Sequence, residues 1–230
     1  MKNLKEIIQE KLKISSKTKI NQEFTCKPKD KAELKKIIKE RLNTDKNANL
    51  NDIDVSNITD MSNIFVDLNP YNIDISEWDV SNVTDMTRMF EYCENFNSNL
   101  SNWDVSKVKN MSWIFAGSKF NNDSICEWDV SNVENMANMF SGCVNFNCNL
   151  SNWDVSNVKN MNSMFYECNN FNCDLSKWDV SNVTDMRYMF EDCKKFDCNL
   201  SKWNVSNITK MIRMFYGCDS LKNKPDWYKG

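Results

Sequence analysis

The sequence repeats itself every 25 residues over about three quarters of its 230-residue length. Ile53 occupies the anchor position of the first unit, and tryptophan occupies it in the six units that follow. These anchors keep the interval without a slip: Trp78, Trp103, Trp128, Trp153, Trp178 and Trp203. A period of this size is typical of arrays whose units are too small to bury their apolar side alone and stack on their neighbours. We therefore expect seven units that share one continuous core.

The pattern inside a unit predicts one short strand and one short helix. Trp103 and Val105 alternate with polar residues, as in a strand with one buried face. Val108, Met111 and Ile114 then recur at intervals of three, the spacing of one face of a short helix. The predicted fold class is α/β: a leucine-rich-repeat-like solenoid with one short parallel strand and one short helix per 25-residue rung. We expect columns of Trp on Trp, Met on Met and Phe on Phe inside it. The Met and Phe columns are Met61, Met86, Met111, Met136, Met161, Met186 and Met211, and Phe65, Phe90, Phe115, Phe140, Phe165, Phe190 and Phe215.

The segments on either side of the repeats are expected to cap the terminal apolar faces of the array. Asp30 followed by Glu33 matches a capping box for a helix that runs to about Leu42. Its apolar face comprises Leu34, Ile37, Ile38 and Leu42, and an earlier helix would present Leu4, Ile7, Ile8 and Leu12. At the other end, Pro225 breaks the repeat. The predicted organisation is an N-terminal helical capping region at 1–50, a seven-unit solenoid at 51–221 and a C-terminal cap at 222–230.

One unit, residues 178–201, reads WDVSNVTDMRYMFEDCKKFDCNLS. This motif resembles the 25-residue repeats of bacterial leucine-rich-repeat surface proteins of the BspA and mycoplasma-lipoprotein type. The resemblance covers about residues 51–221, and the flanking segments 28–42 and 221–228 are similar to that family's flanks. It implies a leucine-rich-repeat-like fold and, for many members, adhesion at the cell surface.

The composition argues against most enzyme classes. The chain has no histidine and only four glycines, so it lacks Ser-His and Cys-His catalytic pairs, His-ligated zinc and glycine-rich phosphate loops. Carboxylate chemistry on the Asp that follows each anchor is the one enzymatic alternative. We expect a non-enzymatic protein without a cofactor or a metal.

That Asp column also has two non-catalytic interpretations. Its carboxylates could bind Ca²⁺ or a basic partner, because carboxylate oxygens are ligands for hard cations. Alternatively, each Asp accepts backbone N–H bonds within its own Asp-x-Ser turn. The structural interpretation is favoured, because Asn204 can make the turn but brings no charge.

Ten cysteines fall mainly into two columns. The first comprises Cys93, Cys143, Cys168, Cys193 and Cys218, and the second comprises Cys148, Cys173 and Cys198. Their spacing does not match the CxxC pattern of zinc sites. We interpret them as small buried apolar residues with reduced thiols, although the second column could pair in an oxidising compartment.

The distribution of charge does not favour nucleic acid as a partner. Residues 1–50 carry 14 basic and 7 acidic side chains, and residues 51–230 carry 15 and 25. The early cations alternate with glutamates, which is typical of a solvated helix surface. No segment has the apolar length of a membrane span, and the first residues lack the apolar run of a signal peptide. We expect a cytoplasmic location for the chain as written, or the cell surface if the native chain carries an export signal.

Positions that vary while their neighbours stay fixed are the candidates for recognition. Ten and thirteen residues after the anchors, large aromatic and arginine side chains recur, and these residue types dominate binding interfaces. The candidate partner-binding residues are Arg88, Trp113, Tyr166, Tyr188, Arg213 and Tyr216, on the side of the predicted helices away from Met and Phe. The rival surface lies on the strand side just before each anchor: Glu77, Asn102, Glu127, Asn152, Lys177 and Lys202.

These observations lead to one function and one alternative. The expected function is a non-enzymatic repeat scaffold for protein–protein interaction. The alternative is a bacterial cell-surface adhesin that binds host or matrix proteins.

Overall fold

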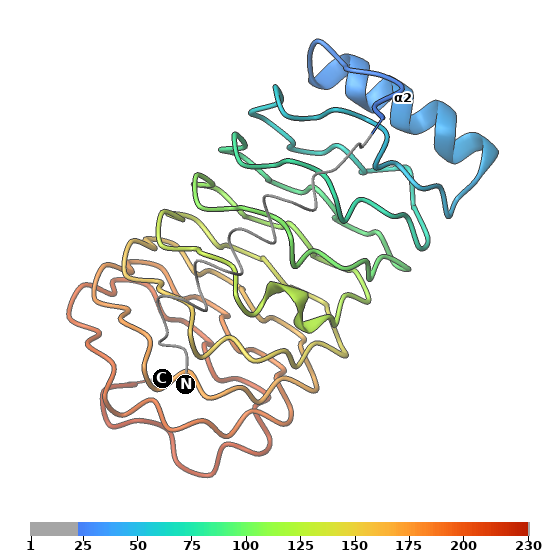
Figure 1. Cartoon of the computed structure of the whole chain (residues 1–230). Helices are drawn as coiled ribbons and strands as arrows, with labels where there is room; N and C mark the ends of the chain where they lie inside the picture. The colour runs from blue at the N-terminus through green and yellow to red at the C-terminus, as the bar shows by residue number, and fades with distance from the viewer. Residues whose placement is uncertain (1–22, 230) are drawn as a thin grey trace, which may run out of the picture.

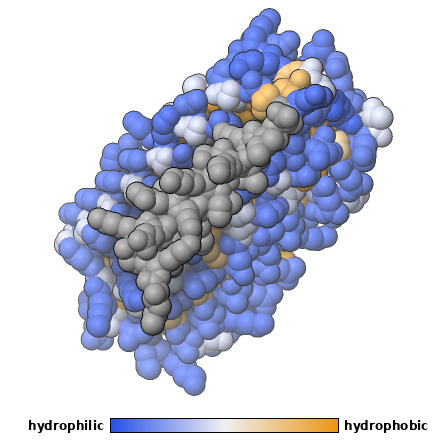
Figure 2. Space-filling view, viewed as in Figure 1, coloured by the Kyte–Doolittle hydropathy of each residue, from blue (hydrophilic) through white to orange (hydrophobic). Residues whose placement is uncertain are grey.

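The computed structural model describes residues 23–229. Helix α2 spans Lys31–Thr44, and a short 3₁₀ helix, η1, spans Asp123–Ile125. The rest of the described chain forms successive turns that stack along one axis, and α2 lies across one end of the stack (Figure 1). Figure 2 shows that the visible face is largely hydrophilic. Within the described residues, no helix is both long and apolar enough to cross a membrane.

The predicted leucine-rich-repeat-like solenoid with a strand and a helix in each rung is wrong. Between residues 23 and 229 there is no strand, and the only helical residues inside the repeats are those of η1. Parallel pairing is reduced to isolated bridges between equivalent residues, such as Asp85 with Asn110. The apolar spacing of three marks corners instead of a helix face, because Val108 N–H bonds to Val105 C=O at 2.9 Å and Ile114 N–H bonds to Met111 C=O at 3.3 Å. Such i to i+3 bonds belong to β-turns.

Two columns of residues have left-handed backbone, which explains why neither helix nor strand continues; Asn69, with φ of 41°, is a further such residue in the first turn. The first column has φ between 53° and 62° and comprises Asn63, Arg88, Trp113, Asn138, Ser163, Tyr188 and Arg213. The second has φ between 54° and 74° and comprises Asp67, Tyr92, Gly117, Gly142, Glu167, Asp192 and Gly217. A right-handed helix and an extended strand both require negative φ. A positive φ at every such position therefore interrupts both.

Side-chain oxygens of Asp and Asn stabilise up to three corners of each turn. The Asp-x-Ser turns predicted after the anchors are confirmed: the Oδ1 atoms of Asp54, Asp79, Asp104, Asp129, Asp154, Asp179 and Asn204 each accept the Ser N–H two residues later. Two further columns make the same contact and were not predicted. They are Asp60, Asp85, Asn110, Asn135, Asn160 and Asp185, and Asn49, Asp74, Asn99, Asn122, Asn149, Asp174 and Asn199. These bonds satisfy backbone donors that a helix or sheet would otherwise satisfy.

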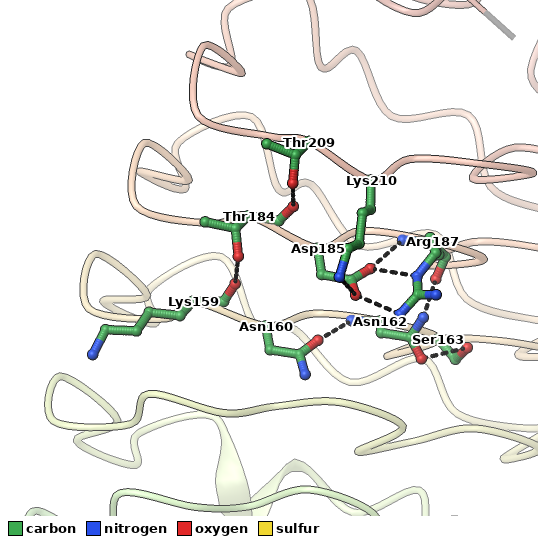
Figure 3. Close-up of polar contacts among 9 residues, drawn as sticks. All are labelled: Lys159, Asn160, Asn162, Ser163, Thr184, Asp185, Arg187, Thr209 and Lys210. Carbon is green, nitrogen blue, oxygen red and sulfur yellow. Dashed lines mark hydrogen bonds and ion pairs between the residues drawn. The ribbon is translucent and has the colours of Figure 1, made fainter.

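Backbone bonds between neighbouring turns hold the stack in register. Thr184 N donates to Lys159 C=O at 2.9 Å, and Thr209 N donates to Thr184 C=O at 3.1 Å. The Oγ1 atoms of both threonines donate to the same carbonyls at 3.2 Å (Figure 3). Because equivalent residues pair at an interval of 25, the sequence period is also the length of one turn of the stack.

Aromatic columns fill the core, as the repeat predicted. Phe rings in the predicted column stack on the next turn with centroids 5.2–5.8 Å apart. A second Phe column, which was not predicted, packs at 3.8–4.2 Å against the first within the same turn: Phe96, Phe120, Phe146, Phe171 and Phe196. Each anchor indole from Trp78 to Trp203 donates its Nε1–H to a backbone carbonyl 28 residues earlier, at 2.9–3.2 Å. The anchors therefore bind neighbouring turns together as well as filling space.

The predicted helix from Asp30 is confirmed as α2, which ends at Thr44. Asp30 Oδ1 accepts Glu33 N–H at 2.9 Å, and Glu33 Oε2 accepts the N–H of Lys29 at 2.8 Å. Leu34, Ile38 and Leu42 are buried in the common core, with Ile37 partly buried against it. The earlier helix predicted around Leu4, Ile7, Ile8 and Leu12 lies outside the described residues.

The C-terminal segment supplies an additional anchor. Trp227 stacks on Trp203 with centroids 6.4 Å apart and donates its Nε1–H to Leu200 C=O at 3.0 Å. It follows Trp203 by 24 residues, one short of the period, so the interval alone did not identify it. Beyond the break at Pro225, this indole therefore continues the Trp column.

Candidate binding groove

The six predicted partner-binding residues lie on one side of the stack, but not on helices. Arg88, Trp113, Tyr188 and Arg213 belong to the first left-handed column. Left-handed backbone is unfavourable for side chains other than Asn, Asp and Gly. The same conformation recurs in every turn and so belongs to the repeat, but in this column it also carries large, varied side chains.

Four of the six residues line a single groove with a volume of about 360 Å³. Its lining comprises Trp113, Asn138, Ser141, Ser163, Tyr166, Tyr188, Glu191 and Arg213. The left-handed column explains the hollow. Its members are large at Trp113 and Tyr188, whereas Asn138 and Ser163 between them are small. Two successive short side chains in a column of long ones leave a gap across the intervening turns.

Arg88 and Tyr216 do not line the groove but support its two ends. The Arg88 guanidinium lies 5.1 Å from the centroid of the Trp113 ring. At the opposite end, the Arg213 guanidinium lies 4.1 Å from the centroid of Tyr216. These cation–π contacts hold a wall residue in place at each end.

Two buried carboxylates beneath these arginines were not among the predicted site residues. Glu91 is 5% exposed and pairs with Arg88 at 3.3 Å, and Glu191 is 4% exposed and pairs with Arg213 through Oε1. Burial raises the pKa of Glu91, with the Arg88 charge opposing the shift and Asp67 adding to it. In the described part of the chain, no hydrogen-bond donor reaches Glu191 Oε2, although that atom is shielded from solvent. The sequence did contain a signal for these carboxylates. Glutamate recurs, as Glu91 and Glu191, thirteen residues after the anchors, where the other turns from Ala116 onward carry small or aromatic residues.

Acidic groups lie near Tyr166 in the groove. A hydrogen bond to Glu167 raises the pKa of Tyr166, and burial and the charges of Glu167, Glu191 and Asp192 act in the same direction. Arg213 is the cation among the lining residues, and its charge is paired with Glu191. The electrostatic environment therefore favours a positively charged ligand.

The rival surface before the anchors has different contacts. Asn102 Nδ2 donates to Glu77 Oε1 at 3.0 Å across one step of the stack. A larger hollow of about 450 Å³ near Lys202 includes Cys173 and Cys198. Its Asp174 and Asn199 side chains accept N–H bonds in their own turns, so those oxygens are already used in shaping the backbone.

Seven of the ten cysteines are buried, in agreement with their interpretation as small buried residues, whereas Cys26, Cys126 and Cys198 are partly exposed. All ten are free in the structure. In the first column, Cys143 Sγ lies 3.0 Å from Phe115 C=O and donates to it, and its equivalents make the same contact. Burial raises the pKa of Cys93 and Cys143 to about 12. Since the thiolate is the reactive form, these thiols are expected to react slowly.

A charged cluster at Asp185 stabilises the outside of the stack (Figure 3). Asp185 is 8% exposed, pairs with Arg187 at 2.7 Å and lies 4.0 Å from Lys210. Burial opposes its ionisation, but hydrogen bonds from Arg187 and the charges of Arg187 and Lys210 outweigh that effect and lower its pKa. The column contains Asn in other turns, such as Asn160, so charge is not required for the turn itself.

We predict that Asp185→Asn lowers the free energy of unfolding at pH 7 by about 1 kcal/mol, since both cationic partners are partly exposed. A lowered pKa contributes stability above the unfolded value and loses it as the pH falls through the folded value. The difference from wild type should therefore shrink as the pH falls below 3.8, the ordinary pKa of Asp. Urea unfolding across this range measures it. Asp85→Asn, in the same column, is the control. A shift of equal size in both variants would contradict the role given to the Arg187 and Lys210 contacts.

The structure defines a class: a repeat protein of stacked 25-residue turns with an aromatic-lined groove on its outer side. The chain belongs to the family described as "Mycoplasma protein of unknown function, DUF285", whose model matches residues 32–125 and 114–228. The match supports the mycoplasma part of the resemblance at the level of this family, and it does not confirm the BspA-type leucine-rich-repeat part. Comparison with the curated proteins and with the solved structures gives no match.

Proposed function

We propose that the protein is a non-enzymatic scaffold that binds a partner protein through the groove between Trp113 and Tyr188. One observation carries this proposal: Trp113, Tyr166, Tyr188 and Arg213 converge on the same hollow. Aromatic and arginine side chains in a concave site are the usual anchors of protein interfaces.

The backbone around the groove supports a binding role. Tyr188 N donates to Ile212 C=O at 3.0 Å, and Trp113 N donates to Ala137 C=O at 2.9 Å. These bonds to the next turn hold two bulky residues at positive φ. Backbone that is already fixed in this way loses little conformational entropy when a partner binds, which favours affinity.

Site-specific crosslinking in cells tests the proposal. Replacement of Tyr166 by p-benzoylphenylalanine should give a covalent adduct with one protein. The same replacement at Tyr92, which is 66% exposed and lies outside the groove lining, is the matched control. Asn152 represents the rival surface. Adducts from Asn152 but not from Tyr166 would overturn the choice of the groove.

The captured protein then allows a quantitative measurement. A Trp113→Ala, Tyr188→Ala double variant should bind it at least about tenfold more weakly, as expected for anchor residues. Glu77→Ala should leave the affinity unchanged. Equal affinity for wild type and the double variant would show that the groove does not bind this partner.

The same scaffold would act as an adhesin if the chain reaches the cell surface, as the resemblance to BspA-type surface proteins implies. Protease treatment of intact cells distinguishes the two locations. Cleavage at the surface would support an adhesin with a host or matrix partner, whereas protection within the cytoplasmic fraction would support an internal partner.

A further inference from the structure

We propose that the groove recognises a lysine side chain of its partner, with the ammonium group bound to Glu191 Oε2. This inference rests on the proposed function, because it assigns the chemistry of the partner at the same site. Glu191 lines the groove, is 4% exposed, and has one carboxylate oxygen with no donor among residues 23–229. A buried carboxylate oxygen without a hydrogen bond is unfavourable, so a ligand that supplies a donor gains from filling it.

The geometry of the carboxylate selects a lysine over an arginine. Oε1 of Glu191 already accepts a hydrogen bond from Arg213. A second guanidinium would need both oxygens for its usual paired contact, and only Oε2 is unoccupied. An ammonium group is a compact donor that can bind a single oxygen.

The rest of the groove suits the stem and the charge of lysine. Glu191 Oε2 is screened from solvent, so the ligand must part the side chains of the lining to reach it. A flexible aliphatic stem can pass between Tyr166 and Tyr188, and their rings can interact favourably with the cation. The Arg88 guanidinium contacts Trp113 from the preceding turn, whereas the groove extends over the turns that follow. Arg88 is therefore not a second cation in the lining of the groove. The acidic body of the molecule, with 25 acidic and 15 basic residues from 51 to 230, adds long-range attraction for a basic segment.

Glu91 provides an internal comparison. It occupies the same column as Glu191, four turns earlier, has nearly the same burial and also pairs with an arginine. It does not line the groove, and neither of its oxygens is both buried and without a hydrogen bond. If lysine recognition depends on the free oxygen in the groove, only Glu191 should contribute to it.

The test is a nuclear magnetic resonance titration of the nitrogen-15-labelled full chain with the peptide acetyl-Gly-Lys-Gly-amide. Saturable shifts are expected at the amides of Ser163, Tyr188 and Glu191. The peptides with norleucine or acetyl-lysine in place of lysine should not saturate. Glu191→Gln should weaken lysine-peptide binding about tenfold or more, because it removes a charge-assisted hydrogen bond. Glu91→Gln should leave the affinity unchanged.

Several results would overturn the assignment. Equal shifts with the lysine and norleucine peptides would indicate an apolar groove. A fourth peptide, acetyl-Gly-Arg-Gly-amide, should bind more weakly than the lysine peptide, and tighter binding would contradict the single-oxygen argument. Because the peptide comparison uses wild-type protein, it remains decisive if Glu191→Gln fails to fold. Crosslinking through Tyr166 to a partner whose contact segment has no lysine would refute this inference while leaving the scaffold function intact. If the lysine peptide bound but crosslinking captured no cellular protein, the lysine site would stand and the scaffold function would be refuted.

Discussion

Replacing Trp128 by alanine is expected to lower the free energy of unfolding by about 3–5 kcal/mol, the cost of removing a large buried aromatic side chain. The Trp128 ring stacks on Trp103 and on Phe115, with ring centroids 6.4 Å and 6.3 Å away. Its Nε1–H donates to Leu100 C=O at 3.2 Å. Its loss leaves a cavity between neighbouring turns in the middle of the stack. Chemical denaturation followed by circular dichroism measures the change.

Two control variants separate the contributions of Trp128. Trp128→Phe keeps an aromatic ring but loses the indole donor. The lost hydrogen bond should lower the free energy of unfolding by about 1 kcal/mol, in addition to the cost of the smaller ring. Leu100 C=O keeps its bond from Trp103 N at 3.1 Å. Trp113→Ala makes the same truncation on the outer side and should cost only about 1 kcal/mol, because the ring is half-buried and loses its contact with Arg88. Equal losses for Trp128→Ala and Trp113→Ala would show that the anchor column does not form the core.

The sequence was informative wherever one residue type recurred in register. The period identified the columns that include Trp128 and Phe140, and the Asp30 and Glu33 pair identified the only α-helix of the described chain. The turn after each anchor was also predictable, because Asn204 could replace Asp there. In each case a side chain performs the same local task in successive turns, so repetition reveals it.

The predicted strand and helix failed because spacing does not report the sign of φ. Intervals of three, as between Val108 and Met111, fit both a helix face and the corners of successive β-turns. The first left-handed column includes Arg88 and Trp113, residues with little preference for that conformation. In the second column, Gly117, Gly142 and Gly217 recur at positive φ and were a signal that the spacing analysis missed. Bonds between turns impose the conformation, and these depend on residues 24 or 25 positions away.

The candidate groove was only partly predictable for a related reason. The large residues Trp113 and Tyr188 could be singled out by their chemistry. The small ones, Asn138 and Ser163, create the hollow between them and carry no distinctive signal. The burial of Glu191 depends on the packing of neighbouring turns, so its free oxygen became visible only in the structure.

A deletion of residues 129–153 is expected to give a folded protein that is shorter by one turn. The deletion joins Trp128 to Asp154 and restores the Trp-Asp-Val motif at the junction. Because equivalent residues bridge at an interval of 25, removal of one whole period lets the following turns pair in register with Trp128 and its turn. The free energy of unfolding should fall by about 1–4 kcal/mol, the usual contribution of 25 residues. Denaturant unfolding should remain a single cooperative transition.

A half-turn deletion provides the contrast for this prediction. Removing residues 129–140 leaves Trp128 and Trp153 in place but eliminates the buried Val130, Val133, Met136 and Phe140 between them. The Asx turns and the bridge at Asn135 are lost as well, so the two halves of the stack can no longer pair through this turn. We expect a loss larger than that of Trp128→Ala, with the two halves unfolding in separate transitions. If the half-turn variant unfolded as cooperatively as the whole-turn variant, the turns would not depend on their neighbours, and the stacked arrangement would be refuted.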